Sequence, residues 1–442
     1  MDASRFAKDF LWGVSTSCYQ IEGAAAEDGR SPSIWDRFAR TPGKVVNGET
    51  GDIACDHYHR YPEDVALMAE LGVDAYRFST AWPRILPEGT GAVNEAGLAF
   101  YDRLVDSLLE RSIEPWICLH HWDLPAVLED RGGWRNRDVA GWFADYTHAV
   151  ASRLGDRVKH FFPFNEPNVL MWLGHATGEH APGHADREAA LAALHHINLA
   201  FGRSAQAIRA AAPDARTGQI ISLQPCEPGR DDPAHRQAAE TIDLFWNLAM
   251  VDPILLGRYP EPLADMLAPW VKPGDLETIA QPINLFGLNH YCRMFCYPDP
   301  ESPFGARIGE TPSGPTTDMG WLIDGTGLRD QLLRLVERYG KQVFYVTENG
   351  GAFPDGAGAD GRVDDRDRIA YFEDYLSNLL EARDRGVDIR GYFVWSFMDN
   401  YEWSLGYAKR FGIVHVDYAT QKRTPKASFD WLQDLIARSR AA

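Results

Sequence analysis

The feature that most constrains the fold of this chain is a rhythm of short apolar runs, each ending in a polar cluster, with amphipathic segments between them. The runs are FLWGVSTS (10–17), DAYRFSTAW (74–82), PWICLHHW (115–122), HFFPFNE (160–166), RTGQIISL (216–223), LFGLNHY (285–291), VFYVTENG (343–350) and RGYFVWSF (390–397). Runs that are apolar on both faces are typical of strands in a parallel sheet that is covered on both sides.

In the segments between the runs, apolar residues return every three or four positions, as they do on the buried face of a helix. The clearest segments are 63–72, 99–112, 143–155 and 368–386. Strands alternating with helices predict an α/β fold with parallel pairing, and eight such units predict a single (β/α)8 TIM barrel over residues 1–442. The long connections 224–284 and 292–342 are expected to form elaborated loops at the C-terminal face of the barrel.

The main alternative is an open, doubly wound parallel sheet. Such a sheet normally carries a glycine-rich phosphate loop after an early strand. Neither G-x-G-x-x-G nor G-x-x-x-x-G-K-[ST] stands at that place in this sequence. The closed barrel is therefore the favoured interpretation.

The charge of the chain excludes some classes of partner. With 44 basic and 63 acidic residues the net charge is −19, so the long-range field repels nucleic acids and anionic membranes. No stretch approaches the roughly 20 apolar residues that span a bilayer. We therefore expect small-molecule partners, no nucleic acid and no membrane, and the sequence leaves a homo-oligomer open.

Six cysteines are dispersed along the chain. They suit reduced thiols better than a disulfide framework. The first residues, MDASRFAKDFLWGV, mix charges into the segment before any apolar run develops, which differs from the layout of a secretory signal. Both observations predict a cytoplasmic location.

Polar or aromatic residues stand at the ends of all but one of the predicted strands. They are Ser17 to Gln20, Arg77, His121 with Trp122, Asn165 with Glu166, Asn289 with Tyr291, Glu348 with Asn349, and Trp395. In a barrel the carboxyl ends of the strands meet at one face, where active sites are built. These side chains are therefore predicted to converge on one cavity.

Two strand-end glutamates are candidates for chemistry. Proline disfavours helical angles at the residue before it, so Pro167 is expected to fix Glu166 as the last extended residue of its strand. Glu348 precedes Gly350 and Gly351, which allow a sharp turn of the backbone with positive φ where required. Either glutamate alone could instead cap a helix or pair with an arginine. Two carboxylates in one aromatic-lined cavity suit hydrolysis of a glycosidic bond.

Seven ordered motifs carry a resemblance to a known family. They are DFLWGVSTSCYQIEGA (9–24), RFSTAWPRI (77–85), LHHWDLP (119–125), FNEP (164–167), GLNHY (287–291), VTENG (346–350) and WSFMDNYEWSLGYAKRFGIVHVDYATQKRTPK (395–426). Together they resemble the family 1 glycoside hydrolases, the β-glucosidase family, over residues 9–433. The resemblance implies a retaining exo-β-glycosidase that cleaves β-glucosides, with β-galactosides or β-fucosides as further substrates.

By this resemblance Glu166 is the general acid/base and Glu348 is the nucleophile of a double displacement. A retaining enzyme needs its two carboxyl groups about 5–5.5 Å apart. Arg77 and Tyr291 are expected to keep Glu348 ionised. A negative Glu348 in turn raises the proton affinity of Glu166, which has to begin as an acid.

The resemblance also assigns residues that hold the substrate. Gln20, His121, Trp122, Asn165, Glu402 and Trp403 are expected to read the hydroxyl groups of the terminal sugar. Trp395 is expected to form the floor below the sugar ring, and Trp321 to flank the leaving group. Asn289, Tyr291 and Phe411 complete the substrate-binding set.

Comparison within the family predicts an unphosphorylated sugar. The phospho-glycosidase branch has a serine where Glu402 stands, and a lysine and a tyrosine downstream that hold phosphate. This chain has Lys409 but Glu402 and Phe411, and a carboxylate repels a phosphate. The thioglucosidase branch replaces the acid with glutamine, whereas Glu166 is present.

Three further expectations follow. Pro163 stands inside a central strand, where it removes a donor from the ladder, so a local bulge is expected near the end of that strand. The histidine pairs of the sequence do not suit one metal ion, so no metal and no cofactor are expected. The alternatives to a hydrolase are a transglycosylating β-glycosidase on the same ester chemistry and a non-catalytic carbohydrate-binding barrel.

Overall fold

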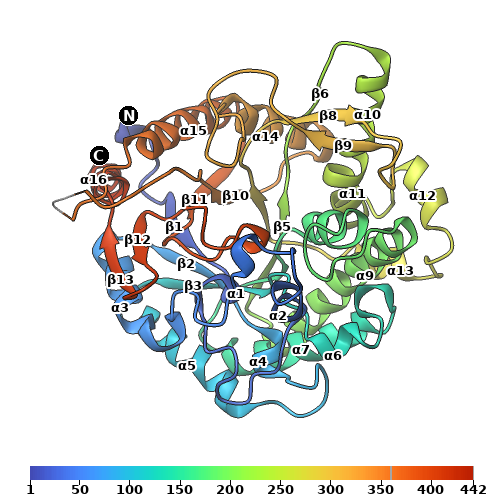
Figure 1. Ribbon diagram of the computed structural model, residues 1–442, viewed down its shortest axis with the longest axis horizontal. Helices are drawn as coiled ribbons and strands as arrows, with labels where there is room; N and C mark the ends of the chain where they lie inside the picture. The colour runs from blue at the N-terminus through green and yellow to red at the C-terminus, as the bar shows by residue number, and fades with distance from the viewer. Residues whose placement is uncertain (359–360, 442) are drawn as a thin grey trace.

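The computed structural model describes residues 1–358 and 361–441. Eight parallel strands close into a barrel in the order β1-β11-β10-β7-β5-β4-β3-β2 (Figure 1). They are β1 (Leu11–Ser15), β2 (Ala75–Ser79), β3 (Glu114–His120), β4 (His160–Phe164), β5 (Arg216–Ser222), β7 (Leu285–Asn289), β10 (Phe344–Asn349) and β11 (Ile389–Trp395). Each lies within, or within one residue of, an apolar run of the sequence, so the prediction of a closed barrel is confirmed.

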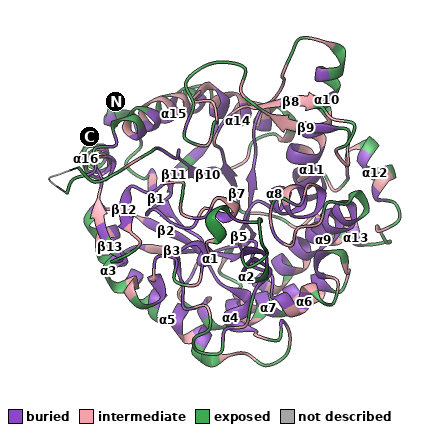
Figure 2. Cartoon of the chain, viewed as in Figure 1, coloured by how far each residue is buried: buried purple, intermediate pink, exposed green. Residues whose placement is uncertain are grey.

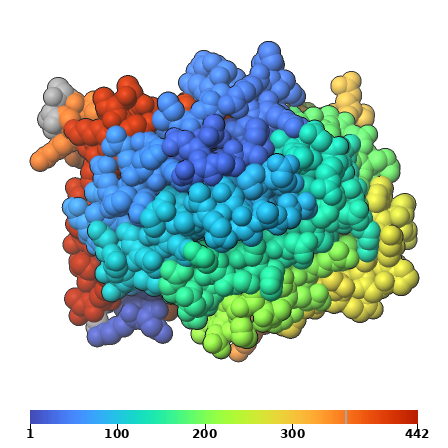
Figure 3. All heavy atoms as spheres, turned by 90° about the horizontal axis from the view of Figure 1, so that it is seen from below, coloured from blue at the N-terminus to red at the C-terminus, as the bar shows by residue number. Residues whose placement is uncertain are grey.

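A ring of helices covers the outside of the barrel (Figure 1). Its main members are α3 (His57–Leu71), α5 (Glu95–Leu109), α7 (Val139–Leu154), α9 (Arg187–Ala211), α14 (Thr326–Tyr339), α15 (Arg366–Asp384) and α16 (Ala427–Ala441). In α5 the buried residues Leu98, Tyr101 and Leu108 recur at helical spacing, which is the amphipathic pattern seen in the sequence. In Figure 3 the colours pass from blue through teal to green in neighbouring bands, so consecutive β/α units lie side by side.

The remaining elements lie in the connections. The short helices are α1 (Cys18–Ile21), α2 (Ile34–Ala39), α4 (Trp82–Ile85), α6 (Ala126–Glu129), α8 (Pro167–Met171), α10 (Pro233–Asp243), α11 (Ala249–Leu255), α12 (Glu261–Leu267) and α13 (Asp275–Ile279). The strands outside the barrel are β6 (Cys226–Pro228), β8 (Met294–Pro298), β9 (Ala306–Gly309), β12 (Val414–Asp417) and β13 (Lys422–Pro425).

The two long connections differ in part from the expectation of mouth loops. Their strands β6, β8 and β9 form a separate three-stranded sheet beside the barrel. However, the second connection also contains α14, which packs beside α15 as a regular helix of the ring (Figure 1). A long insertion before α14 hid its period in the sequence, so the prediction was wrong for residues 326–339.

The inside of the barrel is filled with large side chains. One buried cluster consists of Ala75, Trp116, Phe162, Ile220, Leu285, Tyr345 and Phe393, contributed by seven different strands. Gly13, on the eighth strand, leaves room for this layer, because a Cβ atom there would lie 2.3 Å from the ring of Phe393. Most residues of the barrel strands are buried, with exposed residues only near their amino ends, while the outer faces of the helices are exposed (Figure 2). The filled interior confines any cavity to an end of the barrel.

The bulge expected at Pro163 is present on one side of β4. Phe161 pairs with Thr217 of β5, and Asn165 next pairs with Ile220. β4 therefore advances four residues where β5 advances three. The pairing of β4 with β3 keeps an even register from His160 to Phe164. The missing donor of Pro163 is thus accommodated on the β5 side.

No helix among residues 1–358 and 361–441 combines the length and the apolar character needed to cross a bilayer.

Candidate active site

A cavity of about 780 Å³ opens at the carboxyl ends of the barrel strands. Ten of the residues singled out in the sequence line it: His121, Trp122, Glu166, Tyr291, Trp321, Glu348, Trp395, Glu402, Trp403 and Phe411. They come from segments that are far apart in the sequence, as the barrel prediction requires. Both glutamates therefore belong to one cavity.

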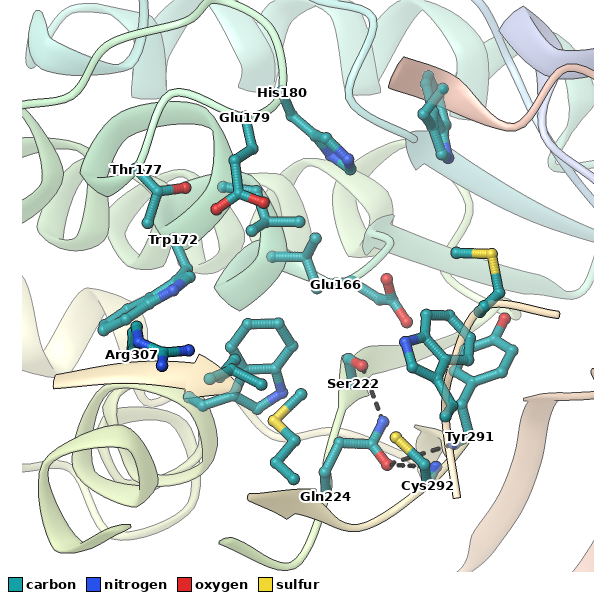
Figure 4. Close-up of a pocket in the computed structure, with 18 of the residues that line it drawn as sticks. Glu166, Trp172, Thr177, Glu179, His180, Ser222, Gln224, Tyr291, Cys292 and Arg307 are labelled. Carbon is teal, nitrogen blue, oxygen red and sulfur yellow. Dashed lines mark hydrogen bonds between the residues drawn. The ribbon is translucent and has the colours of Figure 1, made fainter. Parts of the chain in front are cut away.

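The backbone at Glu166 corrects one expectation. Glu166 is not extended: its φ of 46° and ψ of 60° place it in the left-handed region, directly before Pro167 at the start of α8. Its N–H donates to the carbonyl oxygen of Ile220 at 3.0 Å, which ties the turn to β5. Such a conformation costs roughly 1–3 kcal/mol and persists where the surroundings hold it, as is common at functional sites. The carboxyl group of Glu166 nevertheless points into the cavity, as expected (Figure 4).

The turn after Glu348 also differs from the expectation. Gly350 and Gly351 do not adopt positive φ. A Cβ atom at Gly350 would instead lie 1.7 Å from the carbonyl oxygen of Trp395. Glycine is therefore needed here because two backbone segments approach closely, so that β10 and β11 can both end at the cavity.

Glu348 is held by two donors on opposite oxygens. Arg77 Nη1 donates to Oε1 at 2.5 Å, and the Tyr291 hydroxyl donates a short hydrogen bond to Oε2. Arg77 is fully buried and also donates to Asn165 Oδ1. Burial raises the pKa of Tyr291, so its hydroxyl stays a donor. These contacts favour an ionised Glu348.

Glu166 sits in a different electrostatic environment. Burial, followed by the charge of Glu348, raises the pKa of Glu166 to about 8. Asn289 Nδ2 donates to Glu166 Oε1 at 2.9 Å and opposes that rise. Burial raises the pKa of Glu348 too, but Arg77, Tyr291 and Asn289 counteract it there. Near neutral pH the proton shared by the pair therefore resides on Glu166.

His121 and Asn165 form a second polar pair. Burial lowers the pKa of His121, so the ring is neutral. Its Nε2 lies 2.9 Å from Asn165 Nδ2 and accepts from that amide, which puts the proton on Nδ1. This Nδ1 has no hydrogen-bond partner among residues 1–358 and 361–441. It is therefore a free donor that suits a sugar hydroxyl group.

Glu402 and Trp403, in the segment after β11, line the same cavity. Gln20 Nε2 donates to Glu402 Oε2 at 3.4 Å and to the carbonyl oxygen of Tyr401 at 2.9 Å. Burial and the charge of Glu348 raise the pKa of Glu402 to about 8. Glu402 is therefore largely a neutral carboxylic acid at neutral pH. The ring of Trp403 stacks on Tyr19, which fixes this segment.

Four of the predicted residues lie behind the lining. Gln20, Arg77, Asn165 and Asn289 are completely buried and are engaged with other side chains of the site.

Trp122 also departs from its expected role. Its Nε1 donates to the backbone carbonyl of Asn165 at 3.0 Å, so it presents a ring to the cavity, with its donor already used.

The wall beyond the two glutamates is aromatic. Trp321, Phe411 and Tyr291 pack together, with ring centroids 5.3–6.3 Å apart. Lys409, near this wall, donates to the Asp318 carbonyl at 2.6 Å and also contacts its carboxylate. Its ammonium group is therefore occupied.

The sequence interpretation missed residues from β5 and from the connections after β4 and β5. Ser222, Gln224, Trp172 and Trp246 also line the cavity. The fifth run was the one strand for which no site residue was named. Ser222 near the end of that run and Gln224 directly after it are polar, and that signal was present in the sequence.

Comparison with known proteins identifies the family. The model of glycosyl hydrolase family 1 matches residues 2–441. A β-glucosidase A from Acetivibrio thermocellus is 44% identical over 446 residues, covering 99% of both chains. A bifunctional β-D-glucosidase/β-D-fucosidase from Bifidobacterium breve is also 44% identical, over 459 residues and 98% of both chains.

Solved structures agree with the sequence comparison. The crystal structure of the psychrophilic β-glucosidase BglU from Micrococcus antarcticus matches with a TM-score of 0.96 and 43% identity, over 100% of both chains. Because the family model, the relatives and this fold all span essentially the whole chain, the protein belongs to glycosyl hydrolase family 1, whose members are glycoside hydrolases.

Proposed function

We propose that the protein is a retaining exo-β-glucosidase that hydrolyses terminal, unphosphorylated β-D-glucosyl residues of small glycosides or short oligosaccharides. The single observation that supports this best is the pair of carboxyl groups in one cavity with opposed environments. Glu348 receives hydrogen bonds from Arg77 and Tyr291, while the pKa of Glu166 is raised to about 8.

In the first step Glu348 attacks the anomeric carbon and forms a glycosyl ester, while Glu166 donates its proton to the leaving oxygen. The ester removes the negative charge of Glu348, which had raised the pKa of Glu166. Glu166 then becomes a base that takes a proton from water, and this water hydrolyses the ester. Two inversions at one carbon give retention of configuration.

Two features support a neutral sugar as the substrate. Glu402 lines the cavity where the phospho-glycosidase branch has a serine, and Lys409 is already held by Asp318. The B. breve relative that is named for both glucosidase and fucosidase activity supports β-fucosides as second substrates. We extend this proposal to β-galactosides.

We also propose a cytoplasmic location and partners that are small molecules rather than nucleic acids or membranes. All six cysteines are free thiols in the structure, which suits a reducing compartment. The net charge of −19 opposes binding to polyanions.

The nucleophile is tested with the Glu348→Gly variant and an aryl β-glucoside. We expect hydrolysis to be lost and turnover to return with azide, which enters the space of the carboxylate and gives an α-glucosyl azide. The matched variant Glu166→Gly, with an aryl group that departs without protonation, should give the β-azide, because azide then attacks the ester from the other face. A β-azide from Glu348→Gly, or full activity without azide, would reject the assignment.

A further inference from the structure

The carboxyl end of β5 carries a hydrogen-bond network to which the mechanism above gives no role. Ser222 and Gln224 both line the cavity, and both are almost completely buried, with 4% and 2% of their surface exposed. Figure 4 shows the Ser222 side chain between the Gln224 amide and the Glu166 carboxyl group. A buried primary amide beside a catalytic carboxylate requires an account of all its hydrogen bonds.

Every polar atom of the Gln224 side chain has a partner. Oε1 accepts from the backbone N–H groups of Tyr291 at 3.2 Å and Cys292 at 3.3 Å. Nε2 donates to Ser222 Oγ at 3.1 Å. The backbone of Gln224 is held in turn by Asn247, which accepts from its N–H at 3.1 Å and donates to its carbonyl at 2.8 Å. The amide therefore has one orientation, with its NH2 group toward Ser222.

This orientation determines what the Ser222 hydroxyl can do. Since Oγ accepts from Gln224, its own proton is free to point to another acceptor. The group it faces is Glu166, and the interaction of this hydroxyl with the carboxyl group lowers the pKa of Glu166. The main chain at Ser222 is fixed as well, because Asn168 Nδ2 donates to its carbonyl at 2.6 Å. The hydroxyl is thus oriented so that its proton can point to Glu166.

The other end of the network reaches Glu348. Gln224 Oε1 holds the backbone of Tyr291, and the hydroxyl of Tyr291 donates to Glu348 Oε2. One amide side chain therefore lies between the donor to the acid/base and the donor to the nucleophile. Hydrogen bonds in such a chain fix one another's geometry.

We propose that Ser222 and Gln224 are positioning residues, in which Gln224 orients the Ser222 hydroxyl as a donor to Glu166 and holds Tyr291 as the donor to Glu348. This inference rests on the proposed roles of the two glutamates. The donor from Ser222 matters most in the second step, because it stabilises the ionised Glu166 that has to accept a proton from water.

The first test is Ser222→Ala, followed by the pH dependence of kcat/KM. Removing a donor to the ionised form raises the pKa of Glu166, so the basic limb should move to higher pH by about one unit, while the acidic limb, which reports Glu348, stays in place. With 2,4-dinitrophenyl β-glucoside, whose leaving group departs without protonation, kcat reports hydrolysis of the ester. It should fall about tenfold. Ser222→Thr keeps a hydroxyl group and should restore both properties.

The second test is Gln224→Met, which keeps the length of the side chain but removes its hydrogen bonds. Both limbs should now move to higher pH, because Tyr291 is released from its position as well. A matched control is Ser204→Ala, which removes another buried hydroxyl, one that pairs with Thr147 at 2.8 Å between α7 and α9. It should leave both limbs unchanged.

The outcomes separate this inference from the proposed function. If the wild-type protein shows no β-glucosidase activity, or Glu348→Gly fails the azide test, the proposed function is wrong. If the wild type passes but both limbs of Ser222→Ala stay within about 0.2 pH unit of the wild type while kcat/KM falls, the two residues have a packing role only. An unchanged profile with full activity also overturns the positioning role.

Discussion

At the scale of single residues, the site distinguishes two side chains of the same chemical type by their neighbours alone. Glu348 contacts a guanidinium and a phenol, whereas Glu166 has the negative Glu348 beside it and only polar, uncharged donors at hydrogen-bonding distance among the described residues. The proton affinity of each carboxyl group therefore depends on the side chains that neighbouring strands place beside it. The local motifs NEP and TENG do not reveal these neighbours.

This difference predicts the pH dependence of the wild-type enzyme. Glu166 has to be protonated to act as an acid, and its pKa is raised to about 8, so the acid form dominates below that pH. We expect kcat/KM to stay high up to about pH 8 and then to fall about tenfold per unit. The measurement is kcat/KM for an aryl β-glucoside from pH 4 to 10. A basic limb near pH 5, the range of an ordinary glutamate, would contradict this prediction.

Glu402 is tested by substitution with serine. Glu402→Ser removes a group predicted to bind two sugar hydroxyls, so kcat/KM for neutral glucosides should fall about 10- to 100-fold, the range of one or two strong hydrogen bonds. Glu402→Gln is the matched control. The pKa of Glu402 is raised to about 8, so at neutral pH the amide resembles the neutral acid already present and the loss should be smaller. Unchanged kinetics in Glu402→Ser would remove this residue from the sugar site.

From the sequence, side chains at strand ends could be placed in one cavity. Their hydrogen-bond partners could not be predicted. His121, Glu166, Glu348 and Trp395 were placed in one cavity because the carboxyl ends of barrel strands must meet. The N–H of Trp122 is used by a backbone carbonyl, and Gln224 Oε1 accepts from the backbone N–H groups of Tyr291 and Cys292, which lie in another connection. Such pairings arise only when distant segments pack, so a single sequence does not contain them.

At the scale of elements, the segment after β11 shows how loops at the mouth are held. This segment carries Trp403 and Phe411, and it is anchored beneath by a buried ionic network. Asp399 Oδ1 accepts from Lys426 Nζ at 2.8 Å, while Arg410 contacts the other oxygen at 2.6 Å. Lys426 also donates to Asp355 Oδ2 at 2.7 Å. The network ties the connections after β10 and β11 to the start of α16.

Lys426→Met should therefore destabilise the fold. It removes the ammonium group that bridges Asp399 and Asp355, so that each buried carboxylate keeps a single arginine. Removal of one partner from a buried ion pair typically costs about 3–5 kcal/mol in the free energy of unfolding. Equilibrium unfolding in urea measures this loss. Lys409→Met is the matched control, because its ion pair with Asp318 is partly exposed and should contribute about 1 kcal/mol or less. A loss below about 1 kcal/mol in Lys426→Met would show that Arg368 and Arg410 hold the two carboxylates without Lys426.

Element boundaries were predictable where the hydrophobic period is undisturbed. β4 and β7 were identified within two residues of their ends, since strands buried on both faces read as continuous apolar runs. The helix α14 was missed because the 36 residues 290–325, which hold β8 and β9, separate it from the end of β7. In the small sheet, β6 pairs with β8 across 68 residues of sequence, from Cys226 to Met294, which no local pattern encodes.

At the scale of the whole molecule, closure of the barrel brings the two ends of the chain together. β1 pairs with β11 along five residues, from Leu11 with Gly391 to Ser15 with Trp395. Trp12 Nε1 donates to Ser439 Oγ at 3.2 Å, and Arg438 Nη1 donates to the carbonyl oxygen of Met1 at 3.5 Å. The termini thus lie side by side, on the same flank of the ring (Figure 1). In a closed ring every strand has a neighbour on both sides. The place where the chain begins and ends is therefore not dictated by packing.

A circular permutant tests this view of the architecture. We join residue 441 to Met1 through about six glycine and serine residues, enough to span roughly 13 Å, and open the chain between Asp214 and Ala215. That break lies between α9 and β5, at the end of the barrel opposite the cavity, and Asp214 is exposed. Since every strand keeps its neighbours, we expect a folded enzyme with kcat/KM within about threefold of wild type and a lower melting temperature. A folded permutant without activity would mean that chain order, and not only strand neighbourhood, fixes the geometry of Glu166 beside β5.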